Sequence, residues 1–264
     1  RLEDFTFNMN LVPITGKGNS LECGSLVHRI LEVFYKTHQK NLALEAGEKY
    51  FREESTAIPV ENEKGKDGKL KRVGYNWLIE TMNQYFDFYK NDTWTAVAVE
   101  KVVGEQLYED EEIRVIYKAK TDLLVDTEGG FIPVNHKTMK QRRDTLSLNN
   151  QFMGECILAK SRNIIINKIG FQQSLEPKEK FTRSPVISYS AARLAEQINV
   201  IVYYAKYLVQ LQEQNYYPPR YGFCDKFNGC IFSGICESDP GMREEELKLH
   251  FKVGERWDVT NDED

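Results

Sequence analysis

Two apolar segments joined by a Gly-Gly turn constrain the fold of this chain more than any other feature. The first segment, 112–126, is rich in β-branched residues and carries Asp122; the second, 131–137, carries Asn135 and Lys137. A hairpin through the turn brings the acid close to residues 135 and 137, which share one face of their strand because they lie two apart. An acid, a second oxygen ligand and a lysine at one place predict a site for divalent-metal-assisted phosphodiester hydrolysis.

The patterns around this pair predict an α/β fold. Apolar residues recur at helical spacing on both sides of it, and alternating or wholly apolar segments predict further strands. We expect helices at 24–40, 75–89, 146–161 and 190–213, and further strands at 94–103 and 163–172. Helices before and after the strands favour a central mixed β-sheet flanked by helices, followed by a cysteine-containing segment.

The length of 264 residues suits one large domain with appendages. We expect a single domain over 1–236, with an irregular arm at 1–22, a core at 23–215 and a cysteine segment at 216–236, followed by an acidic tail. Apolar runs of only a few residues predict no membrane span. Since no signal peptide is visible, we expect a cytoplasmic protein, although the chain starts at Arg1 rather than Met.

The net charge of −5 argues, by itself, against a nucleic-acid partner. Its distribution removes that objection. Residues 237–264 carry −6, which leaves the remainder at +1, and residues 136–183 carry +6. A basic segment beside the predicted site is where phosphate contacts are needed, although a solvated charged surface would look the same. Lys140, Arg142 and Arg143 are the candidate DNA contacts in this segment.

Five short motifs, in order along the chain, resemble those of the PD-(D/E)XK nuclease superfamily, in particular its RecB-like branch, which includes CRISPR adaptation nucleases and phage exonucleases. The matching segments are Gly24–Glu32 (G-x-x-x-H-x-x-L-E), Tyr117–Val125 (the G-x-h-D strand), Val134–Thr138 (V-D-x-K-T), Gln151–Glu155 (Q-h-x-x-Y) and Cys230–Cys236 (C-x-F-x-x-x-C). The chain departs from these motifs at Ala119 in place of glycine, Asn135 in place of aspartate and Glu155 in place of tyrosine.

The resemblance implies a restriction-endonuclease-like core and a role for each matching residue. His28 and the backbone carbonyl of His136 would be metal ligands, and Asp122 would be the central ligand. Lys137 would be the catalytic lysine, and Gln151 would orient that lysine or the DNA backbone. The implied activity is that of a Mg²⁺- or Mn²⁺-dependent deoxyribonuclease, an exonuclease with a two-metal-type mechanism. Its partners would be single-stranded DNA or duplex ends, and a protein of a recombination, repair or phage complex.

Asn135 is the departure that matters most, because it stands at a catalytic and metal-ligating position. A neutral amide gives one weak oxygen ligand and no charge. The residue is either an introduced Asp→Asn change or a mark of a naturally degenerate member; we favour the introduced change and expect an impaired chain. The alternative is a catalytically inactive nucleic-acid-binding or assembly module that keeps the fold. A third hypothesis is an RNA-directed nuclease.

The chain has five cysteines, an odd number that does not favour a disulfide framework. Cys224, Cys230 and Cys236 resemble the iron–sulfur motif of the branch, with five residues instead of two in the first gap. A [4Fe–4S] cluster needs four thiolates. Cys23 and a residue ahead of Arg1 are equal alternatives for the fourth, whereas Cys156 is expected in the core.

Overall fold

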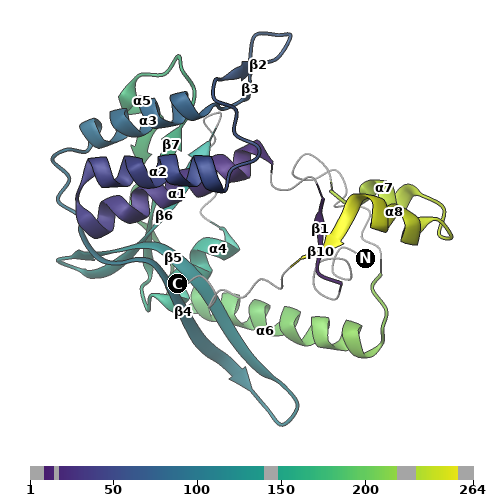
Figure 1. Ribbon diagram of the computed structural model, residues 1–264. Helices are drawn as coiled ribbons and strands as arrows, with labels where there is room; N and C mark the ends of the chain where they lie inside the picture. The colour runs from purple at the N-terminus through teal and green to yellow at the C-terminus, as the bar shows by residue number, and fades with distance from the viewer. Residues whose placement is uncertain (1–8, 15–17, 140–147, 219–229, 255–264) are drawn as a thin grey trace. The chain divides into compact units, whose positions relative to one another are not determined.

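A computed structural model describes residues 9–14, 18–139, 148–218 and 230–254 (Figure 1). Two compact units share these residues. The larger unit spans 18–199, and the smaller unit combines the N-terminal residues up to 17 with the segment from 200 onward. No helix among the described residues is both long and apolar enough to cross a bilayer.

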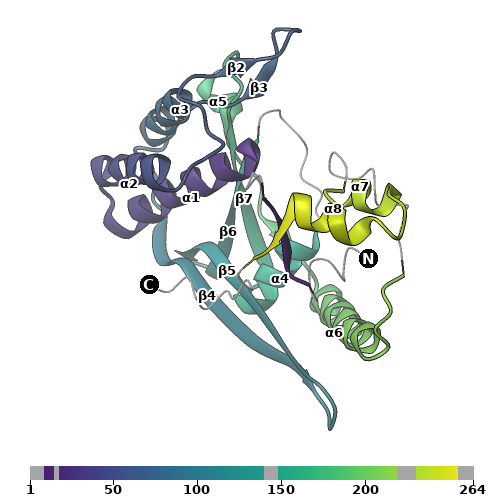
Figure 2. The same ribbon diagram turned by 45° about the vertical axis from the view of Figure 1, so that its right-hand side comes forward.

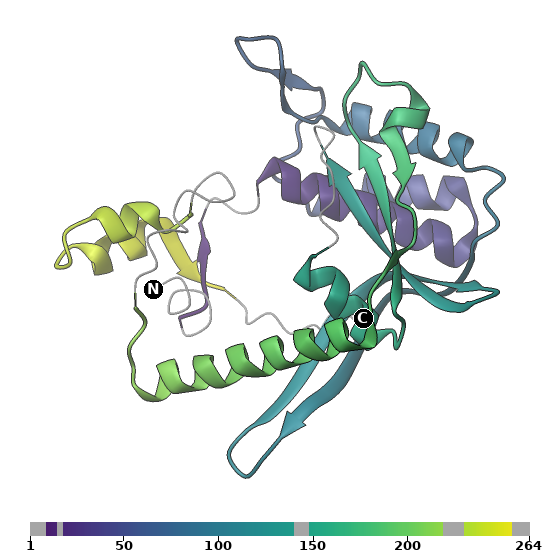
Figure 3. The ribbon, with the colours of Figure 1, turned by 180° about the vertical axis from the view of Figure 1, so that it is seen from behind.

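The larger unit is built on one mixed sheet. Its strands lie in the order β4 (Thr95–Glu109), β5 (Arg114–Thr127), β6 (Gly130–Met139), β7 (Asn163–Gly170) and β8 (Phe181–Arg183), and β9 (Ile187–Ser188) also pairs with β7. All neighbours are antiparallel except β6 and β7, which are parallel because α4 (Asn150–Leu158) crosses between them. The long β4–β5 hairpin extends beyond the rest of the sheet (Figure 3).

Helices cover both faces of this sheet (Figure 2). On one face lie α1 (Asn19–Thr37), α2 (Lys40–Glu53) and α3 (Tyr75–Phe88). The residues of α1 that are buried recur at helical spacing and pack with those of α3 and with the sheet: Cys23, Leu26, Val27, Ile30, Leu31 and Tyr35. On the other face, α4 packs Phe152, Met153 and Cys156 against β7. The mixed α/β fold with a central sheet flanked by helices confirms the predicted fold class.

Residues at the two ends of the described chain form a small sheet in the smaller unit. Strand β1 (Leu11–Pro13) pairs antiparallel with β10 (Phe251–Val253), which follows α8 (Arg243–His250). Phe251 stacks on Phe232 with ring centroids 4.6 Å apart, beside Ile235 of α7 (Ser233–Glu237). The sequence pattern had suggested an irregular arm and a polar tail here.

Most predicted elements of the larger unit are present, with shifted ends. The strand pattern over 112–126 is one long strand. The short hairpin of β2 (Glu63–Lys64) and β3 (Leu70–Arg72) was not predicted from the sequence. Helix α2 was not predicted from the sequence. Helix α6 (Ala191–Glu213) matches the expected long helix, and the boundary between the two units falls within it.

A buried carboxylate at the start of α1 fixes the segment that follows α2. Glu22 accepts hydrogen bonds from the Ser55 hydroxyl, from the backbone N–H and hydroxyl of Thr56, and from the backbone N–H of Ala57 at 2.7 Å. Burial alone would raise the pKa of Glu22, but these hydrogen bonds outweigh it and lower the pKa below its ordinary value. The ionised carboxylate therefore stabilises the fold.

Glu22→Gln is expected to lower the free energy of unfolding by about 2 kcal/mol at pH 7, because a neutral amide replaces a carboxylate that accepts several hydrogen bonds. Since the pKa of Glu22 is lowered in the folded state, its stabilisation is present above the ordinary glutamate value and is lost as the pH falls through the lowered one. Urea unfolding at pH 7 and at acid pH measures the difference in unfolding free energy between the unmodified chain and the variant. This difference should become smaller at acid pH. Glu48→Gln, which removes a surface ion pair with Arg52, is the control and is expected to change stability by less than about 0.5 kcal/mol. An equal loss at both pH values would contradict the prediction.

Candidate active site

Asp122 lies where β5 and β6 separate. The two strands pair from Leu123–Val134 to the turn, where Gly130 has a φ of +104° that L side chains rarely adopt. Just beyond the last pair, an oxygen of Asp122 accepts a hydrogen bond from the backbone N–H of His136 at 2.7 Å. Burial raises the pKa of Asp122, as does the charge of Glu100, against the lowering effect of His28.

Two further side chains reach this carboxylate from different elements. The Nδ1 atom of His28, on α1, lies 3.1 Å from an oxygen of Glu100 on β4 and 3.5 Å from an oxygen of Asp122. Burial lowers the pKa of His28, but the hydrogen bond to Glu100 and the charges of both acids raise it above its ordinary value. Ligand atoms of these three residues lie within 4.8 Å of one another, so His28, Glu100 and Asp122 could hold a cation between them.

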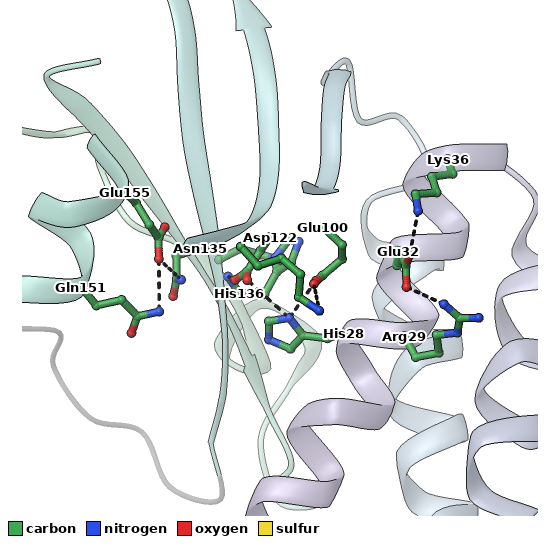
Figure 4. A network of polar contacts seen from close by, with 12 residues as sticks. His28, Arg29, Glu32, Lys36, Glu100, Asp122, Asn135, His136, Gln151 and Glu155 are labelled. Carbon is green, nitrogen blue, oxygen red and sulfur yellow. Dashed lines mark hydrogen bonds and ion pairs between the residues drawn. The ribbon is translucent and has the colours of Figure 1, made fainter. Parts of the chain in front are cut away.

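The catalytic lysine predicted from the motif belongs to a chain of hydrogen bonds that ends at Asn135. Figure 4 shows the part of this chain from Gln151 through Glu155 to Asn135. Lys137 Nζ donates to Gln151 Oε1 at 2.8 Å, Gln151 Nε2 donates to Glu155 Oε1 at 3.1 Å, and Asn135 Nδ2 donates to the same oxygen at 2.8 Å. Asn149 caps α4 by accepting from the backbone N–H groups of Gln151 and Phe152, which fixes the start of the helix beside β6.

Glu155 is almost completely buried, with 2% of its surface exposed. Burial raises its pKa to about 8, and the nearby charge of Asp122 adds to this shift, whereas Lys137 and the two amide donors oppose it. The second oxygen of Glu155 and the side-chain oxygen of Asn135 are buried and have no hydrogen-bond partner among the residues that the structure describes.

His136 points to the opposite face of β6 from Asn135 and Lys137. Its ring stacks on Tyr35 of α1 at 5.9 Å, and its Nδ1 accepts a hydrogen bond of 2.9 Å from Asn167 on β7. Asn167 also donates to the hydroxyl of Tyr85 at 2.9 Å. Complete burial lowers the pKa of His136 well below its ordinary value, so the ring is neutral.

The geometry places an acidic pair with a histidine beside a lysine, at the end of a hairpin in a mixed sheet. The sequence matches the profile of the PD-(D/E)XK nuclease superfamily over residues 7–237. The chain belongs to the PD-(D/E)XK nuclease superfamily. Its mixed sheet with flanking helices is consistent with a restriction-endonuclease-like core, and membership makes it a metal-dependent nuclease whose substrate is a nucleic acid.

Among solved structures, the one titled "Crystal structure of SSO0001" is similar to this chain at 15% sequence identity, with 84% of this chain and 88% of that chain covered and a TM-score of 0.37. No curated protein sequence matches the chain.

This PD-(D/E)XK site contains two acids whose importance the sequence did not show. Glu100 was not among the predicted site residues, but it has a φ of +47° within β4 and approaches His28. A bulge at Ala96–Ala98, close to Glu100, interrupts the alternation of side chains along β4. The sequence pattern did not predict this bulge. Glu155 was noted only as a departure from the Q-h-x-x-Y motif. This departure from the motif is the sequence feature that could have identified Glu155 as a site residue.

Several predicted site residues lie outside the described part of the structure: Lys140, Arg142, Arg143 and Cys224. Of the other cysteines, Cys230 and Cys236 are half-buried against the small core of Phe232, Ile235 and Phe251. Cys23 is 1% exposed in the core of the larger unit, where its thiol lies 3.9 Å from the carbonyl oxygen of Val73.

The buried network behind β6 is expected to determine how firmly the site is held. Asn167→Ala leaves the Tyr85 hydroxyl and His136 Nδ1 without this donor, and we expect a loss of about 3 kcal/mol of unfolding free energy. Tyr35→Phe removes only the hydrogen bond to Tyr85, at 3.2 Å, and is expected to cost about 1 kcal/mol. Urea unfolding of both variants measures the difference, and equal losses would show that the network does not act as described.

Proposed function

We propose that this nuclease cleaves DNA with Mg²⁺ or Mn²⁺, acting as an exonuclease on DNA ends. The observation that carries the proposal is the cluster of His28, Glu100 and Asp122 beside Lys137. These ligands fit a divalent cation, since two carboxylates and an imidazole converge and the carboxylates would otherwise repel each other. When bound, the cation supplies an activated water and offsets charge on the phosphate.

The protein's own groups orient the substrate around that position. Asp122 is fixed by the backbone N–H of His136, so its second oxygen is directed toward His28. Lys137 is held by Gln151, and its ammonium group can neutralise charge that develops on the scissile phosphate. Lys168 lies beside Lys137 in the register of β6 and β7, which adds positive charge next to the site.

The Asn135→Asp variant carries the acid that the V-D-x-K-T motif has at this position and is the chain in which to test this function. We expect it to degrade linear DNA with Mg²⁺ or Mn²⁺ and to leave closed circular DNA intact. In this background, Asp122→Asn or Lys137→Met should lower the rate on the order of 100-fold or more, because each removes a charge that acts at the reacting phosphate. Gel assays of both DNA forms, with RNA of the same sequence alongside, measure the outcome.

Cleavage of RNA alone would favour the RNA-directed alternative, and cleavage of circular DNA would show an endonuclease. If Asn135→Asp binds DNA but neither it nor the unmodified chain cleaves any substrate with either metal, the nuclease proposal is wrong. The inactive binding module, for which Asn135 is the supporting observation, would then be correct.

We also propose a structural [4Fe–4S] cluster held by Cys224, Cys230 and Cys236. Cys230 and Cys236 fit this role because they lie on one short segment and are only half-buried. Cys23 fits it poorly because its thiol is enclosed in the core of the larger unit.

Anaerobically purified protein is therefore expected to be brown, with broad visible absorption and bound iron. Cys230→Ser and Cys236→Ser should lose the colour because a cluster needs four thiolates. Cys156→Ser, at a buried cysteine of α4, is the control. Colourless protein with stoichiometric zinc, or with no metal, would refute the cluster.

A further inference from the structure

Asn135 and Glu155 depart from the motif pattern at two positions 20 residues apart, and their side chains are hydrogen-bonded to each other at 2.8 Å. Position 135 has an asparagine where the motif has an aspartate, and position 155 has a glutamate where the motif has a tyrosine. The two changes together keep the number of carboxylates around the site constant. The difference is that one of these carboxylates is on helix α4 instead of strand β6.

Burial of this pair leaves two oxygens without partners. Asn135 is 1% exposed and Glu155 is 2% exposed, and neither Asn135 Oδ1 nor Glu155 Oε2 has a hydrogen-bond partner within the described ranges. Buried polar atoms almost always have a hydrogen-bond partner. Two buried oxygens without partners would therefore be unfavourable if Asn135 and Glu155 served only to fill the interior. The unpaired carboxylate oxygen of Glu155 is a hard ligand of the kind that a divalent cation prefers.

The position of the pair connects it to the rest of the site. Figure 4 shows Asn135 between Glu155 and Asp122. The charge of Asp122 acts on Glu155, and Gln151 joins Glu155 to Lys137 through two hydrogen bonds. Glu155 is therefore coupled by charge to Asp122 and by hydrogen bonds to Lys137.

We propose that Glu155 binds the divalent cation in place of the missing acid at position 135, so that the chain as written is an active nuclease. This inference rests on the proposed metal-dependent nuclease function. It makes Asn135 part of a matched native pair and replaces our expectation of an impaired chain with an introduced Asp→Asn change.

Metal binding without substrate tests the proposal directly. Isothermal titration with Mn²⁺ should show binding to the unmodified chain and at least about tenfold weaker binding to Glu155→Gln. Mg²⁺ should raise the melting temperature of the unmodified chain and have little effect on the variant. Glu105→Gln is the matched control, because it removes the same charge from an exposed residue that pairs with Lys160 on the surface.

Moving the acid back to the strand gives a second test that does not depend on how well Glu155→Gln folds. Asn135→Asp combined with Glu155→Gln places one carboxylate at 135 and none at 155, and we expect this double variant to regain Mn²⁺ binding and cleavage. Circular dichroism and the metal-free melting temperature establish that each variant is folded.

The outcomes separate this inference from the proposed function. Weakened binding in Glu155→Gln and recovery in the double variant support the inference. If the unmodified chain binds Mn²⁺ and cleaves DNA and Glu155→Gln does so equally, the inference is wrong and the nuclease function stands. The same holds if only Asn135→Asp binds and cleaves. If no variant binds metal or cleaves, the proposed function fails and the inference fails with it.

Discussion

The site depends on one hydrogen bond, from the backbone N–H of His136 to the carboxylate of Asp122. It forms where β5 and β6 stop pairing, so an acid inside an apolar sheet is satisfied by the neighbouring strand's own backbone. A buried carboxylate without such a donor would be costly. The opening between the two strands therefore does two things: it provides a donor for Asp122, and it leaves the other oxygen free to face His28.

Strand β6 is supported differently on its two faces, and the contrast explains how a charged site can lie in a sheet. On the face of α1 and α3, His136, Asn167 and Tyr85 form a buried, neutral network that fixes the position of the strand. On the face of α4, Asn135 and Lys137 take part in a network of amides and charges. Because side chains alternate along β6, the residue that supports the fold (His136) and the residues of the candidate site (Asn135 and Lys137) lie on opposite faces of the strand.

The sequence predicted the hairpin that brings Asp122 close to residues 135 and 137, and it predicted most helices, because these follow from periodicities of two and 3.6 residues. It did not predict the position of Glu100, because a left-handed residue after a bulge breaks the alternation. It also did not predict the pairing of β1 with β10, which joins segments separated by almost the whole chain. Such features depend on tertiary contacts that short-range patterns do not carry.

Glu155 shows why a motif defined by position can misjudge a site. What matters to a cation is where carboxylate oxygens are in space, and α4 comes close enough to the sheet to bring one there. Gly154 makes this approach possible, since a Cβ at this residue would lie 2.1 Å from the hydroxyl oxygen of Tyr117 on β5. With α4 this close, residue 155 reaches the side chain of residue 135 directly. An acid at position 155 on the helix can therefore take the place of an acid at position 135 on the strand. A change of residue type at one of these positions need not change the chemistry of the site.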